Sequence, residues 1–64
     1  MIEDPDIFRA AQLMIDRHGD EASWRAALRV SDLWGAGDRF GSAIWRQIVT
    51  AIEELQRGRR EALN

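Results

Sequence analysis

The sequence predicts an all-α protein, a small three-helix bundle with short turns between the helices. Apolar residues recur at intervals of three and four along three segments, and glycines separate these segments. No segment alternates apolar and polar residues in the way that strands do. We expect residues 1–64 to form a single domain, ordered at about 5–57, with a mobile tail at 58–64.

The first helix is expected at Pro5–Arg17. Asp4 can cap its free amides, and the fixed φ of proline suits the first helical position. Gly19 should end it, because glycine readily adopts a left-handed conformation. One face of this segment is apolar and should enter the core: Ile7, Phe8, Ala11, Met14 and Ile15.

The second helix is expected at Glu21–Trp34, with Asp20 as its cap. Its inner stripe is rich in alanine, which allows another helix to approach closely. We therefore expect this stripe to lie flush against the third helix: Ala22, Ala26, Val30 and Leu33, flanked by Ala27 and Trp34.

The third helix is expected at Arg39–Arg57, with Asp38 as its cap. Trp45 lies at the middle of its inner row and should contribute most to the core, roughly 3–5 kcal/mol on truncation if fully buried. Gly41 falls on the same row, where its missing side chain would let the second helix come close. The row is the widest in the chain: Phe40, Gly41, Ile44, Trp45, Ile48, Ala51, Ile52 and Leu55.

The chain is small enough for its stability to be marginal. By surface scaling, a protein of 7.3 kDa exposes about 10,500 Å² unfolded and about 4,200 Å² folded. If roughly 60% of the buried area is apolar, its burial contributes about 95 kcal/mol at ~25 cal/mol per Å², and ordering the chain costs about the same. No cysteine is present to form a disulfide. Any further stabilising free energy must come from good helix packing, a second copy or another partner.

The charge balance argues against general attraction to polyanions. Nine basic and eleven acidic residues give a net charge of -2, and all the basic residues are arginines. No apolar run is long enough to span a membrane, and the acidic start at 1–6 is unlike a signal peptide. We expect a cytoplasmic location.

Trp24 and Leu28 do not follow the inner stripe of the second helix. They are spaced at i and i+4 and project from a different side. One interpretation makes them core residues that cover the end of the first helix. The other makes them an exposed pair that binds a protein partner or a second copy, with Arg25 and Arg29 as the polar rim.

Nucleic-acid binding is the alternative function. The segment Ala26–Trp34 has a superficial likeness to the turn of a helix-turn-helix, which would use Arg25 and Arg29. Arginine nevertheless stands where that motif has its turn glycine, and Gly35 would soon break a recognition helix. A basic cluster near the C-terminus could also touch nucleic acid, although its acidic neighbours favour a solvated helix end: Arg57, Arg59 and Arg60.

His18, the only histidine, is the one candidate for catalysis or metal binding. The alternative is a histidine favoured by the dipole at a helix C-terminus. Asp16 and Asp20 are nearby, but no metal-ligand spacing, nucleophile or phosphate-binding loop accompanies them. We therefore expect no enzyme activity, no cofactor, no metal and no small-molecule ligand.

One resemblance covers most of the chain. His18–Ala22, Gly37–Asp38, Gly41 and the row from Trp45 to Leu55 resemble a family of short uncharacterised bacterial proteins, classed as a domain of unknown function. The resemblance implies a stand-alone cytoplasmic helical protein, and it supplies no catalytic or binding residues.

Overall fold

The described part of the chain, residues 4–63 of the computed structural model, is helical almost throughout. A first helix, α1 (Pro5–His18), leads through a short 3₁₀ turn, η1 (Gly19–Glu21), into α2 (Ala22–Gly35). A connection then leads to α3 (Arg39–Leu63). No strand occurs among these residues, so the all-α prediction is confirmed. Residues 1–3 of the expected acidic start and residue 64 of the expected tail lie outside the described residues.

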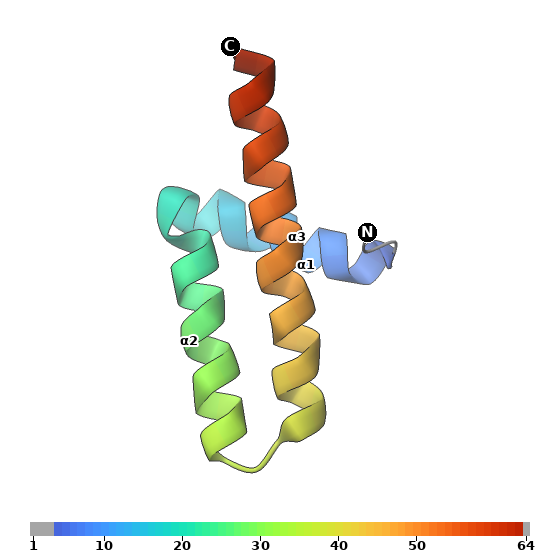
Figure 1. The fold of residues 1–64 in the computed structure, drawn as a ribbon, viewed down its shortest axis with the longest axis vertical. Coiled ribbons are helices and arrows are strands. Elements are labelled where there is room, and N and C mark those ends of the chain that lie inside the picture. Colours follow the sequence, from blue (N-terminus) through green and yellow to red (C-terminus); the bar gives the residue numbers. More distant parts are fainter. Residues whose placement is uncertain (1–3, 64) are drawn as a thin grey trace.

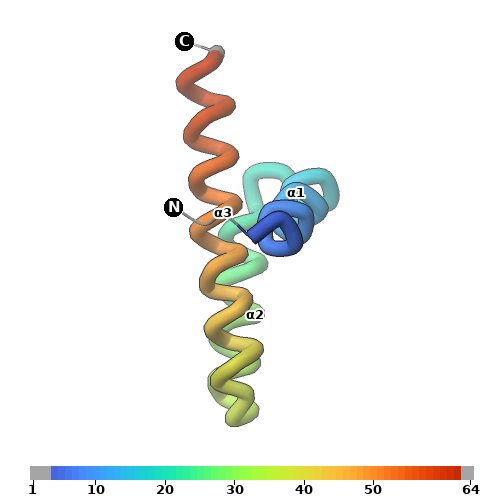
Figure 2. Tube along the Cα trace, turned by 90° about the vertical axis from the view of Figure 1, so that its right-hand side faces the viewer, coloured from blue at the N-terminus to red at the C-terminus, as the bar shows by residue number. Residues whose placement is uncertain are grey.

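The helices do not form a three-helix bundle, and that prediction is wrong. α2 and α3 run antiparallel as a helical hairpin, and α1 crosses behind them at a steep angle (Figure 1). Figure 2 shows α1 nearly end on, against one side of the hairpin. Because the helical backbone continues through η1, α1 and α2 are two arms of one bent segment. The second element of the fold is the long α3.

The helix starts follow local capping rules with one exception. The amide of Asp6 donates to the carboxylate of Asp4 at 2.9 Å, and Pro5 occupies the first turn of α1, as expected. The bend falls at Gly19, whose φ is 56°. Asp20 is not the cap of α2: it lies inside η1, and α2 begins without a side-chain cap.

The absence of a side chain at Gly41 serves the cap of α3. The amide of Gly41 donates to Oδ1 of Asp38 at 2.8 Å, which caps the helix as predicted. The nearest atoms that a Cβ on Gly41 would meet all belong to the Asp38 carboxylate, with Oδ2 at 2.5 Å. The absent side chain therefore leaves room for the capping carboxylate.

The core lies where α1 crosses the hairpin. Trp45 packs against this core but is only half-buried, so the full burial on which its expected contribution depends is not met. The alanine stripe of α2 is confirmed in its first half only, because Val30 and Leu33 are half-buried. The buried residues come from all three helices and are mostly small or β-branched: Ile7, Ala11, Ile15, Ala22, Ala26, Ile48, Ala51 and Ile52.

Two polar contacts tie the elements together outside the apolar core. Ser42 is fully buried, and its hydroxyl donates to the backbone carbonyl of Val30 at 3.2 Å, which joins α3 to α2 near the connection. At the other end, Nε2 of Gln56 donates to the carbonyl of Gly19 at 3.0 Å. This bond gives the bend between α1 and α2 a fixed contact on α3.

α3 continues through Leu63, beyond the end predicted at Arg57. Its last turns project past α1 and α2 (Figure 1). The molecule is consequently open. Its accessible surface is 4756 Å², above the ~4,200 Å² expected for a compact protein of this mass. Its radius of gyration is 11.9 Å, above the ~10.7 Å expected for this length.

Candidate partner-binding surface

Trp24 and Leu28 are exposed, so the interpretation that placed them in the core is wrong. Trp24 is 59% exposed and Leu28 46% exposed. Ala22 and Ala26 of the same helix are fully buried. At about 100° per residue, Trp24 and Leu28 point away from those alanines, toward the side of α2 opposite both neighbouring helices. Neither α1 nor α3 covers this pair.

Small residues continue the same line toward the end of α2. Ser31 and Gly35 follow Trp24 and Leu28 at steps of three and four, and both are exposed. We call these four residues the α2 outer face: Trp24, Leu28, Ser31 and Gly35. Its first half is bulky and apolar, and its second half is nearly flat.

Charged residues border the α2 outer face on one side. The guanidinium Nε of Arg25 donates to the carboxylate of Glu21 at 3.2 Å, and both side chains are exposed. Asp32 lies on the same flank two turns later and is also exposed. Among the described residues Asp32 forms no ion pair. This border therefore carries a paired cation at one end and an anion at the other.

Of the two arginines expected on the polar rim, the structure places only Arg25 beside the α2 outer face. Arg29 turns toward α3 and lies over the indole of Trp45, with Cζ 5.8 Å from the ring centroid. This geometry is that of a cation–π contact. Arg29 thus covers the half-buried Trp45 on the inner side of the hairpin.

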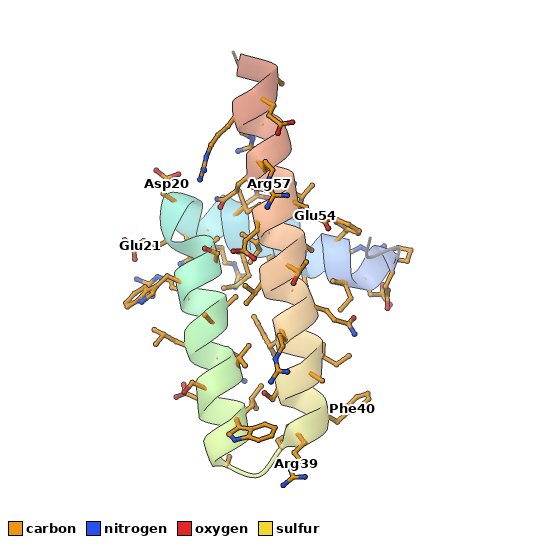
Figure 3. All side chains as sticks on the ribbon, in the orientation of Figure 1. Asp20, Glu21, Arg39, Phe40, Glu54 and Arg57 are labelled. Carbon is orange, nitrogen blue, oxygen red and sulfur yellow. The ribbon has the colours of Figure 1, made fainter. Side chains whose placement is uncertain are left out.

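Three further large apolar side chains are exposed: Leu13, as its place off the apolar stripe of α1 indicated, and Trp34 and Phe40, which were not recognised as surface from the sequence. Leu13 on α1 is 49% exposed, Trp34 at the end of α2 is 55% exposed, and Phe40 at the start of α3 is 78% exposed. Arg39 lies over the ring of Trp34, with Cζ 5.4 Å from its centroid. Figure 3 shows Phe40 pointing away from α2 near the connection. Phe40 lies in the first turn of α3, where a side chain has few neighbours, and this position could have predicted its exposure. Its spacing in the apolar row predicted burial instead.

The C-terminal arginines stand among acidic and neutral residues. Arg57, Arg59 and Arg60 are exposed on the projecting turns of α3. A polar hollow of about 200 Å³ lies between these turns and the start of α2, lined by Ser23, Glu53, Gln56, Arg57 and Arg60. A neighbouring hollow of about 190 Å³ includes Asp20. The arginines therefore do not form a continuous basic surface.

His18 ends α1 and is half-buried. Over residues 4–63, no group of three or more His, Cys, Asp or Glu side chains is arranged to hold a metal ion. A hollow of about 410 Å³ is lined by Ala43, Arg46, Gln47 and Thr50. All four come from α3, so this hollow is an open groove along one helix.

No helix within residues 4–63 is both long enough and apolar enough to cross a membrane. Comparison of the chain with protein-family models, with curated proteins and with solved structures finds no match. Exposure and helix geometry alone therefore identify the α2 outer face as the candidate surface.

Proposed function

We propose that this protein acts without catalysis, through contact with another protein chain, and that the α2 outer face is the contact surface. The observation that carries the proposal is the exposure of Trp24 and Leu28, one turn apart, on the side of α2 that no other helix covers. If α2 served only to stabilise the fold, we would expect polar residues on this water-facing side.

Burial of Trp24 and Leu28 by a partner would contribute substantially to the free energy of binding. Full burial of an apolar side chain contributes about 1.5–3 kcal/mol, and about half of each side chain is still in contact with water. Tryptophan and arginine are also the residue types most enriched among the residues that dominate binding energy. Trp24 beside Arg25 fits that composition.

Nucleic-acid binding is the second proposal, and the geometry favours it less. Arg25 is paired with Glu21, and Arg29 lies over Trp45. The arginines of α3 share their hollows with Glu53 and Asp20. Phosphate binding depends on cations gathered on one surface. This alternative predicts an affinity for duplex or single-stranded nucleic acid that falls steeply with salt, and no binding at low salt would contradict it.

The contact-surface proposal is tested by affinity capture from an extract of the source cells. The tagged wild-type chain is compared with Trp24→Ala combined with Leu28→Ala, and with Leu13→Ala. Leu13 is a matched control because it is exposed to a similar extent on a different helix, 49% against 46% for Leu28.

We expect the wild type and the Leu13 variant to retain the same protein chain, and the double variant to lose it. Because the substituted residues are exposed and alanine favours helix, circular dichroism should report unchanged helix content in all three. Identical retention by all three chains would contradict the proposal.

A further inference from the structure

We propose that the partner of the α2 outer face is a second copy of this chain, bound with its α2 antiparallel to the first. The two-fold axis would pass beside Leu28, between the middle turns of the two helices. This inference rests on the proposed contact surface and adds to it the identity of the partner and the direction of approach.

Charges along the border of the α2 outer face are complementary in an antiparallel pair. Arg25 lies about as far before the Leu28–Arg29 point as Asp32 lies beyond it. An antiparallel pair centred there brings Arg25 of each copy opposite Asp32 of the other, twice in the dimer. Asp32 has no ion partner among the described residues of the monomer. The second copy supplies that partner.

Side-chain sizes along the α2 outer face are also complementary in an antiparallel pair. Within the α2 outer face, the bulky Trp24 comes first, and the small Ser31 and Gly35 come last. Antiparallel pairing sets the indole of each copy over the flat end of the other and sets Leu28 against Leu28 at the axis. Large residues opposite small ones are how helices interdigitate closely.

Parallel pairing of the same faces has neither property. It would place Trp24 against Trp24 and Ser31 against Ser31, so that the tryptophans would hold the helices apart. The charged borders of the two copies would lie on opposite sides of the contact, and Asp32 would gain no cation. The residue order along α2 therefore selects the antiparallel arrangement.

The fold leaves the approach open. α2 forms one edge of the molecule, with α3 on its other side and α1 behind the hairpin (Figure 1). Figure 3 shows Glu21, which borders the α2 outer face, pointing outward from that edge. A second copy can meet α2 without touching the core.

The size of the contact sets the expected strength. A helix of 14 residues is about 21 Å long, and one pair of such helices buries less than the ~1,200–2,000 Å² of a stable interface. We expect a dissociation constant in the micromolar range or weaker, and thus a dimer that forms with concentration.

The test is sedimentation equilibrium of the full chain over a concentration series from micromolar to millimolar. We expect the average mass of the wild type to rise from the monomer toward twice that value. Leu28→Glu puts two carboxylates at the axis, so it should stay monomeric throughout. Leu13→Glu, the matched control on α1, should behave as the wild type. Circular dichroism of each variant verifies that the helices are intact.

A charge exchange tests the antiparallel direction. Arg25→Asp alone and Asp32→Arg alone should each weaken dimerisation about tenfold, because each places like charges opposite one another. The combined variant should recover the wild-type constant to within a few-fold. Dimerisation that Leu28→Glu abolishes, but that the combined exchange does not restore, would overturn the antiparallel geometry.

These experiments can contradict the dimer without contradicting the α2 outer face as a contact surface. A wild-type chain that stays monomeric at every concentration overturns the second-copy inference. The capture experiment with the alanine variants then decides the contact surface by itself. A dimer that persists in Leu28→Glu also overturns the inference, because the copies would then meet through another part of the molecule.

Discussion

The apolar row of α3 has the same spacing along two stretches, yet only one of them is buried. In the middle of the helix, Ile48 is 4% exposed, and Ala51 and Ile52 are fully buried. Closer to the connection, Ile44 and Trp45 are half-buried, and Phe40 is 78% exposed. The two stretches are alike in sequence and differ in what covers them.

The difference shows that the crossing of α1, and not the apolar row itself, decides where the core lies. α1 crosses the middle of α3 near the first turns of α2 (Figure 2), and α1 itself ends at the bend at Gly19. Below the crossing, α3 has only α2 as a neighbour. A helix with a single neighbour can bury only one side of a wide apolar face.

The largest effect should come from the covered stretch. Ile52→Ala removes three methyl or methylene groups from a fully buried site and should lower the free energy of unfolding by about 2–5 kcal/mol. Urea denaturation followed by circular dichroism measures it. The matched control is Ile44→Ala in the half-buried stretch, which should cost clearly less. Equal losses at the two positions would break the distinction between the stretches.

Trp45→Ala should cost less than its size suggests. The side chain is half-buried and loses its contact with Arg29 together with part of its packing, so we expect about 1–3 kcal/mol. The same denaturation experiment applies, with Arg29→Ala to isolate the cation–π contact. A loss above that of Ile52→Ala would place the energetic centre of the core nearer the connection than the burial indicates.

The end of the hairpin depends on polar contacts. Asp38→Ala removes the carboxylate that accepts a hydrogen bond from the Gly41 amide. It should lower the free energy of unfolding by about 1 kcal/mol. Asp38→Asn keeps an accepting oxygen and should retain most of that stability. Thermal unfolding of the two variants side by side separates the cap from the negative charge. An asparagine variant as weak as the alanine variant would indicate that charge matters more than the hydrogen bond.

The smallest effect should come from the uncovered end. Phe40→Ala exchanges a side chain that is 78% exposed for a better helix former, so the free energy of unfolding should change by no more than about 0.5 kcal/mol. A dilute sample in the denaturation experiment avoids contacts between chains. A loss above 1 kcal/mol would mean that Phe40 packs against the fold in solution.

Local sequence signals predicted most helix starts and the bend, because caps and turns depend on residues close together in the sequence. Asp4, Pro5 and Asp38 act as predicted, and the bend falls at Gly19. Asp20 failed as a cap because the chain tightens into a 3₁₀ turn there. The end of α3 was predicted too early, at Arg57, because a single glycine after it does not break the helix, which continues through Leu63.

The candidate surface could be anticipated only as a choice between two interpretations. The spacing of Trp24 and Leu28 puts them off the inner stripe, but spacing does not say whether another helix reaches that side. The positions of α1 and α3 decided that the pair is exposed. Likewise, the indole of Trp45 has the same place in the row whether α1 covers it or crosses above it.

The sequence by itself determined that this chain is helical, where its helices begin and bend, and which residues share each face. These properties follow from backbone geometry and from side chains three or four positions apart. Only the tertiary structure decided which apolar faces are covered. Coverage depends on the angle at which α1 crosses the hairpin, and that angle arises from packing between residues far apart in the chain.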